Sequence, residues 1–277
     1  MLPATVYPIP SGAETTAIIL FLLITVALPV YVLAFRRIRT GEVWGPAEMV
    51  ATTVLFVAAL LLVGPVVGAA EPLSLLSLSL LTIIQNVLFV GLPAFVALLR
   101  YRLPAASLGL RTFDWLRGVV IGAVVAAIAT PLAVGGEQLA VYLLGLLEGP
   151  EQAAARVAME HLADPLLPIL GTVQAPASIA WVIVLLCVVV PIGEEVFFRG
   201  FIFGGLRARW GVPVAAAASA VFFAAVHLQL VHGLPIFFLG VLLALAYQRT
   251  GSLVPAIVAH SLNNVIALLS AWQGWGI

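Results

Sequence analysis

The chain has 277 residues, of which 63% are hydrophobic and only 9% are charged, and its mean hydropathy is +1.20. Soluble domains carry about a quarter charged residues, so we expect most of this chain to fold in lipid. A formal net charge of zero argues against a nucleic-acid partner, and the single cysteine, Cys187, cannot form an internal disulfide.

Apolar segments that could cross a bilayer recur along the whole chain. A membrane-spanning helix needs roughly 18 or more predominantly apolar residues. The candidate segments are 16–35, 48–69, 75–99, 115–135, 178–206, 212–230, 233–248 and 252–271. Because 178–206 is too long for one straight span, we expect Pro191 and Gly193 to kink it. The sequence therefore predicts an all-α membrane protein, a polytopic bundle of about eight transmembrane helices.

The basic residues, all of which are arginines, predict the orientation of this bundle. With the N-terminus outside, the connections on the inner side contain Arg36, Arg37, Arg39, Arg100, Arg102, Arg111, Arg117, Arg207, Arg209 and Arg249. Only Arg156 falls on the outer side, and Arg199 falls within a span. Cytoplasmic loops are enriched in arginine in this way. We therefore predict a multi-pass protein with both termini outside. The arginine-only, alanine-rich composition predicts a prokaryotic cytoplasmic membrane.

The longest segment expected outside the membrane is 136–175. It starts next to Glu137, includes an apolar run at 139–147 that is compatible with an interfacial helix, and contains several prolines. We expect Glu137 to need no special role, and we expect His161 and His232 to be surface residues.

Ionisable residues inside the spans are concentrated in the last hundred residues. Glu194, Glu195 and Arg199 lie in one apolar segment, and His227 and His260 lie in later ones. A charged residue at the bilayer centre costs about 2.5–3.5 kcal/mol, so each of these needs a partner or a function. The i,i+4 spacing of Glu195 and Arg199 predicts an ion pair within one helix.

Distances along the predicted helices place the polar side chains in one layer of the membrane. At a rise of 1.5 Å per residue, Glu194 and His227 each lie roughly 20 Å from the predicted inner surface. His260 and Asn264 lie roughly 16 and 22 Å from the same surface. The sequence therefore predicts that four polar residues from three helices meet.

Such a layer is suited to hydrolysis by either of two mechanisms. In one, Glu194 and His227 activate a water, while His260 and Asn264 donate hydrogen bonds to the oxyanion. In the other, Glu194, His227 and His260 coordinate Zn²⁺, which leaves a fourth position for water. The residues alone do not separate these mechanisms. Asn263 is expected to be a helix-packing residue.

Three motifs in this order resemble those of a known family. They are Glu194-Glu195-x-x-x-Arg199, Phe223-x-x-x-His227 and His260-x-x-x-Asn264. The resemblance is to the CPBP (Abi) family, which includes CAAX prenyl endopeptidases of the Rce1 type and bacteriocin-processing enzymes. It implies that Glu194 and His227 activate the water and that His260 and Asn264 form the oxyanion site. Glu195 and Arg199 would have a supporting role.

The resemblance covers 178–270 and implies a peptidase domain at 111–277, preceded by a scaffold of transmembrane helices at 1–110. The family is described both as metalloproteases and as glutamate-type peptidases, of which the second is preferred here. The implied partners are the lipid bilayer and a membrane-associated peptide or protein, including prenylated or otherwise lipid-anchored chains. Two alternatives stay open: a non-catalytic binding or immunity protein of the same fold, and a transporter or proton relay.

Overall fold

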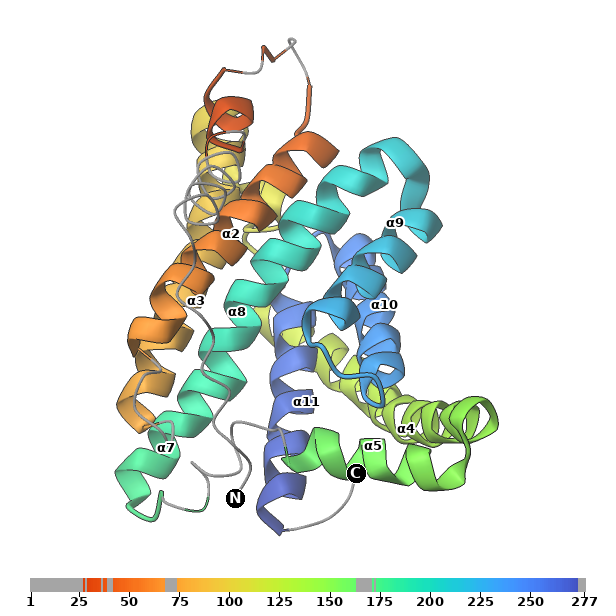
Figure 1. The fold of residues 1–277 in the computed structure, drawn as a ribbon. Coiled ribbons are helices and arrows are strands. Elements are labelled where there is room, and N and C mark those ends of the chain that lie inside the picture. Colours follow the sequence, from red (N-terminus) through yellow and green to blue (C-terminus); the bar gives the residue numbers. More distant parts are fainter. Residues whose placement is uncertain are drawn as a thin grey trace, which may run out of the picture.

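The computed structural model of the protein describes residues 27, 29–35, 37–38, 42–67, 74–162, 171 and 173–273. Every regular element within these residues is a helix (Figure 1). In chain order they are α2 (Pro46–Val67), α3 (Leu75–Ala94), η1 (Phe95–Arg100), η2 (Ala105–Leu108), α4 (Trp115–Glu148), α5 (Pro150–Leu162), α7 (Pro176–Val184), η3 (Leu185–Val189), α8 (Val190–Glu194), η4 (Glu195–Phe203), α9 (Gly204–Val226), α10 (Gly233–Thr250) and α11 (Val254–Gln273).

Six of the described helical segments are long and apolar enough to cross a membrane. They are Pro46–Val63, Leu75–Arg100, Trp115–Glu148, Pro176–Val226, Gly233–Thr250 and Val254–Trp272. These segments confirm the predicted polytopic all-α membrane fold. The first predicted span, 16–35, lies mostly outside the described residues.

The segment Pro176–Val226 contains two of the predicted spans. Gly211 separates them, because its backbone (φ 74°, ψ 170°) is not helical and the chain reverses direction there. Before that point, Figure 1 shows one continuous helix from α7 through α8 into α9. Pro191, where we expected a kink, lies in α8, and the hydrogen bonding is π-helical on either side of α8, in η3 and η4. Such π-bulges occur frequently at functional sites.

Helix α4 is longer than the sequence suggested. It continues through Pro131 and Glu137 to Glu148, so the expectation that a loop begins at Glu137 was wrong. Two glycines precede Glu137, and glycine weakens a helix. At Gly136 the packing explains the glycine: a Cβ there would lie 3.2 Å from the ring of Phe238 and 3.3 Å from the backbone nitrogen of Pro235. Glycine thus lets α4 approach α10 closely.

The helix that runs through α7, η3, α8 and η4 lies in the middle of the molecule. Helix α3 contacts it from one side, and α11 and α10 contact it from the other. Helix α4 packs in turn on α10 and α11. A Cβ on its Gly118 would lie 2.5 Å from Val254 of α11, and one on Gly122 would lie 2.6 Å from Val258, so glycine at both positions lets the helices approach closely. The three segments with the sequence motifs therefore lie side by side.

Candidate active site

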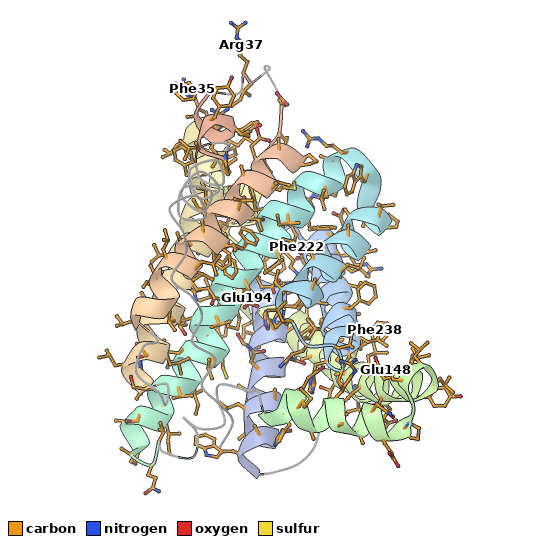
Figure 2. The ribbon with its side chains drawn as sticks, in the orientation of Figure 1. Phe35, Arg37, Glu148, Glu194, Phe222 and Phe238 are labelled. Atoms are coloured by element: carbon orange, nitrogen blue, oxygen red, sulfur yellow. The ribbon has the colours of Figure 1, made fainter. Side chains whose placement is uncertain are left out.

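The paired glutamates lie inside the bundle at the junction of α8 and η4. Figure 2 shows Glu194 between the end of the molecule marked by Arg37 and the end marked by Glu148. Glu194 is 7% exposed and Glu195 is completely buried. Burying a carboxylate without compensation is very unfavourable, so each of these glutamates needs partners that compensate its charge.

Glu195 is the centre of a buried hydrogen-bonded network. Its Oε1 accepts hydrogen bonds from Nη1 of Arg199 and from Nδ1 of His260, each at 2.8 Å. The guanidinium of Arg199 also donates to the carbonyl of Gly240 at 3.3 Å and lies 4.3 Å from the ring centroid of Phe223. The predicted ion pair between Glu195 and Arg199 is confirmed. The hydrogen bond from His260 of α11 to Glu195 was not predicted.

The bond to Glu195 orients the imidazole of His260. A carboxylate only accepts hydrogen bonds, so Nδ1 of His260 carries the hydrogen and Nε2 points away from Glu195. Nε2 faces Oε2 of Glu194 at 3.7 Å. That oxygen is buried and has no hydrogen-bond partner among the described residues. A carboxylate oxygen and an imidazole nitrogen thus face each other at slightly more than hydrogen-bonding distance.

His227 is positioned by the end of its own helix. Its Nδ1 lies 2.7 Å from the carbonyl of Phe223, one of the last carbonyls of α9, which have no partner within the helix. Because a carbonyl only accepts, Nδ1 carries the hydrogen and Nε2 of the neutral ring keeps its lone pair. The ring of Phe223 contacts both His227 and His260, with centroid distances of 4.8 and 5.7 Å.

Asn264 has a hydrogen-bond partner on another helix that the sequence did not suggest. Its Nδ2 donates to the carbonyl of Leu186 in η3 at 2.9 Å. The preceding π-helical bond runs from the nitrogen of Val190 to the carbonyl of Leu185, so the next donor in line for Leu186 would be Pro191. Proline has no N–H, and Asn264 supplies the missing donor. The second N–H of its amide group is left for another acceptor.

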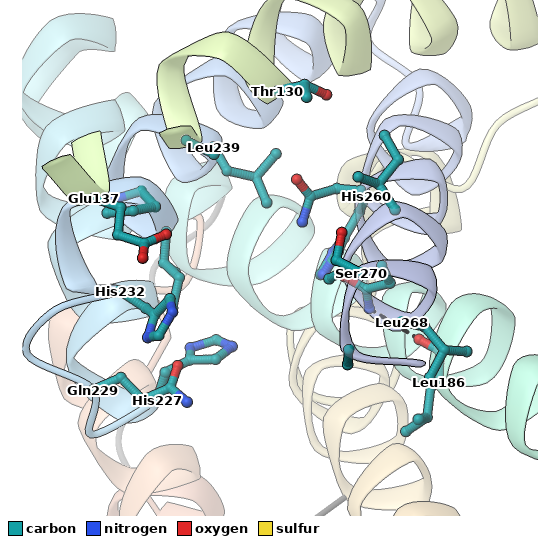
Figure 3. A pocket seen from close by; sticks show the side chains of 18 of the residues that line it. Thr130, Glu137, Leu186, His227, Gln229, His232, Leu239, His260, Leu268 and Ser270 are labelled. Atoms are coloured by element: carbon teal, nitrogen blue, oxygen red, sulfur yellow. Dashed lines mark hydrogen bonds between the residues drawn. The ribbon is translucent and has the colours of Figure 1, made fainter. Parts of the chain in front are cut away.

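A pocket of about 420 Å³ opens beside this network. His227, His260 and Asn264 line it, whereas Glu194 does not and lies behind His260. Figure 3 shows His227 and Gln229 on one wall, with His260 and Ser270 on the opposite wall. The structure thus brings all six predicted site residues to one region. Among the described contacts, however, Glu194 has its close approach to His260, not to His227.

Several pocket residues were not predicted. Glu137, Gln229, His232 and Asn263 line the same pocket, so placing His232 on the surface and treating Asn263 as a packing residue missed their exposure to it. A signal for Glu137 was present in the sequence. It is the only charged residue between 118 and 147, and an ionisable residue inside an apolar span indicates a functional site.

Helix α5 holds the loop that follows His227. The carboxylate of Glu160 accepts hydrogen bonds from the backbone nitrogens of Leu230 (2.7 Å) and Val231 (2.9 Å) and lies 3.2 Å from Nδ1 of His232. The side chain of Val231 is fully buried in a cluster with residues of α4 and α5. The α4–α5 hairpin therefore fixes one wall of the pocket in two ways: through the hydrogen bonds of Glu160 and through the apolar packing of Val231.

The zinc arrangement considered from the sequence does not fit these positions. No three His, Cys, Asp or Glu side chains among the described residues are grouped so that they could hold a metal ion. Glu194 and His260 approach each other, but the third proposed ligand, His227, does not join them in a group of three. The mechanism below is therefore assigned to the side chains themselves.

Comparisons with known proteins agree with the motifs. Residues 176–266, from α7 into α11, match the family model described as type II CAAX prenyl endopeptidase Rce1-like. A Bacillus subtilis (strain 168) protein named "Putative membrane peptidase YdiL" is 34% identical over 101 residues, which are 36% of this chain and 40% of that protein. No solved structure matches the chain. Residues 176–266 of this membrane protein are thus similar to the Rce1-like endopeptidases, in agreement with the resemblance of its motifs to the CPBP family, and the match spans less than half of either chain.

Proposed function

We propose that this protein is an intramembrane endopeptidase that hydrolyses a peptide bond in a membrane-associated substrate. The observation that supports this most is the buried oxygen of Glu194, which has no hydrogen-bond partner among the described residues and faces His260 beside the pocket. Buried polar groups in a purely structural network are nearly always hydrogen-bonded. An unpaired carboxylate oxygen at membrane depth is instead expected where a water or a reacting group binds.

In this mechanism Glu194 and His227 activate the attacking water. Both offer an acceptor: Oε2 of Glu194 is unpaired, and Nε2 of His227 keeps its lone pair. They take the proton from water as its oxygen attacks the scissile carbonyl carbon. The proton then passes to the leaving nitrogen as the carbon–nitrogen bond breaks.

The developing oxyanion is stabilised by donors from α11. The second amide hydrogen of Asn264 and, in its protonated form, Nε2 of His260 provide them.

The substrate class follows from the position of the site. The pocket lies among membrane-spanning helices and has mainly apolar walls, so it suits a peptide segment that is held at the membrane. Prenylated or otherwise lipid-anchored chains belong to this class. We place the protein in a prokaryotic cytoplasmic membrane with the arginine-rich connections inside.

Cleavage of a membrane-associated reporter peptide by the detergent-solubilised protein tests this function. Glu194→Gln and His227→Ala should each lower kcat by about 10²–10⁴-fold, since each removes a group that transfers protons. Glu151→Gln is the matched control, because Glu151 is an exposed carboxylate on α5.

Two results would contradict the proposal. Retained cleavage in both Glu194→Gln and His227→Ala would place the chemistry elsewhere. Loss of wild-type cleavage in a chelator, with recovery on adding zinc, would replace the side-chain mechanism by a metal-dependent one. Folding of each variant is checked by its elution in size-exclusion chromatography.

A further inference from the structure

We propose that Glu137 determines substrate specificity by binding a cationic group of the substrate in the pocket. This inference rests on the proposed function, because selectivity presupposes cleavage. It goes further by naming a chemical class: peptides with a lysine, an arginine or a free amine close to the scissile bond. The same inference predicts that a substrate carboxylate is disfavoured at this wall.

Glu137 faces the pocket from a helix that is fixed in place. It is half-buried on α4, and it has no hydrogen bond or ion pair among the described contacts. The neighbouring Gly136 allows α4 to lie against Pro235 and Phe238 of α10, which brings Glu137 to the pocket wall. Figure 3 shows Glu137 on the same side as His232 and Gln229, across from His260.

Among the described residues, no basic side chain lines the pocket to neutralise Glu137 or to bind a substrate carboxylate. None of the described arginines lines it. Arg199 is committed to Glu195, and Arg156 donates two hydrogen bonds to Glu148 at 2.6 and 2.8 Å. Outside the described residues, the basic residues of the sequence are Arg36 and Arg39, and the segments 1–26, 68–73, 163–170 and 274–277 contain neither lysine nor arginine.

The other ionisable groups that line the pocket do not offset this carboxylate. Any positive charge on His232 is compensated by Glu160, which lies 3.2 Å from its Nδ1. His227 is bonded to the carbonyl of Phe223, and His260 to Glu195. In a pocket with mainly apolar walls, a charge interacts more strongly than it does in bulk water. An ammonium or guanidinium group is therefore favoured beside Glu137, and an anionic group is repelled.

A series of matched reporter peptides tests the proposal. Lys, Gln or Glu is placed in turn at each of the three positions on either side of the scissile bond, and kcat/KM is measured for the wild type. At the position that contacts Glu137, the Lys peptide should be cleaved about tenfold faster than the Gln peptide. The Glu peptide should be slower than both. Blocking a nearby C-terminal carboxylate as an amide should raise kcat/KM.

Variants of Glu137 assign this preference to one side chain. Glu137→Gln should bring the Lys-to-Gln ratio of kcat/KM close to one, and Glu137→Arg should favour the Glu peptide. Glu151→Gln, the exposed control on α5, should keep the wild-type ratio.

A wild-type Lys-to-Glu ratio near one at every position would overturn the inference, even if a variant fails to fold. So would a Glu137→Gln protein that keeps the wild-type preference. Failure of the wild type to cleave any peptide would instead count against the proposed function.

Discussion

At the scale of single residues, the site depends on side chains that satisfy groups on other helices. Pro191 removes a backbone donor from the central helix, and Asn264 of α11 supplies a replacement to Leu186. Glu195 would be a costly buried charge, but Arg199 and His260 both donate to it. Each of these residues looks unusual in its own segment and has a clear physical reason once its partner is known.

The Arg199 guanidinium is expected to be the largest single contributor to stability at the site. Arg199→Met leaves Glu195 buried with His260 as its remaining donor, and breaking a buried pair in this way costs about 3–5 kcal/mol. The free energy of unfolding in mixed detergent micelles measures this loss. Arg207→Met is the control, because Arg207 is only partly buried and bonds to Gln248, so its loss should cost about 1 kcal/mol or less. Equal losses for the two variants would contradict the assignment.

At the scale of the elements, the α4–α5 hairpin acts on the site without supplying the proposed water-activating groups. The loop 228–232 follows His227 directly and includes Leu228, whose backbone is left-handed (φ 55°) and whose side chain is 91% exposed. Such a loop has few contacts of its own to define its position. Glu160 and the buried Val231 provide them from outside the loop.

Glu160 is therefore expected to be a positioning residue for His227. Glu160→Ala removes the acceptor for the loop nitrogens, and a small displacement of a catalytic group lowers kcat by about 10- to 100-fold. The fall should appear in kcat with little change in KM, and Glu160→Gln, which keeps one acceptor oxygen, should recover part of it. Glu151→Ala on the same helix should match the wild type. A wild-type kcat in Glu160→Ala would show that α5 does not position His227.

At the scale of the whole molecule, charge is distributed unequally between the two ends. Nearly all arginines follow one set of helix ends, whereas Glu148, Glu160 and the loop 228–232 belong to the other. The pocket is lined by Gln229 and His232 of that loop, and it therefore lies towards the arginine-poor end. If arginine marks the cytoplasmic side, the pocket faces the outer side of the membrane.

Cysteine labelling in intact cells tests this orientation. In a Cys187→Ala background, Leu228→Cys should react with a membrane-impermeant maleimide in intact cells, because Leu228 is highly exposed near the pocket. Ala208→Cys, exposed at the arginine-rich end, should react only after the cells are lysed. The reverse labelling pattern would show that the pocket faces the cytoplasm.

The amino-acid sequence by itself determined the lipid solvent and the polytopic all-α fold, and it predicted that the polar residues share one layer of the membrane. These follow from quantities that are local or summed along the chain: composition, the length of apolar segments, and the rise per residue of a helix. The pairing of Glu195 with Arg199 was predictable for the same reason, since residues four apart share a helix face. The catalytic roles assigned to Glu194 and His227 stay predictions that the variants above test.

Only the tertiary structure decided which side chains meet across helices. Depth along the membrane does not specify rotation about each helix axis, and neighbouring residues on a helix point about 100° apart. Packing fixes that rotation. It brings His260 to both glutamates, bonds Asn264 to Leu186, and, through the close approach at Gly136, turns Glu137 into the pocket.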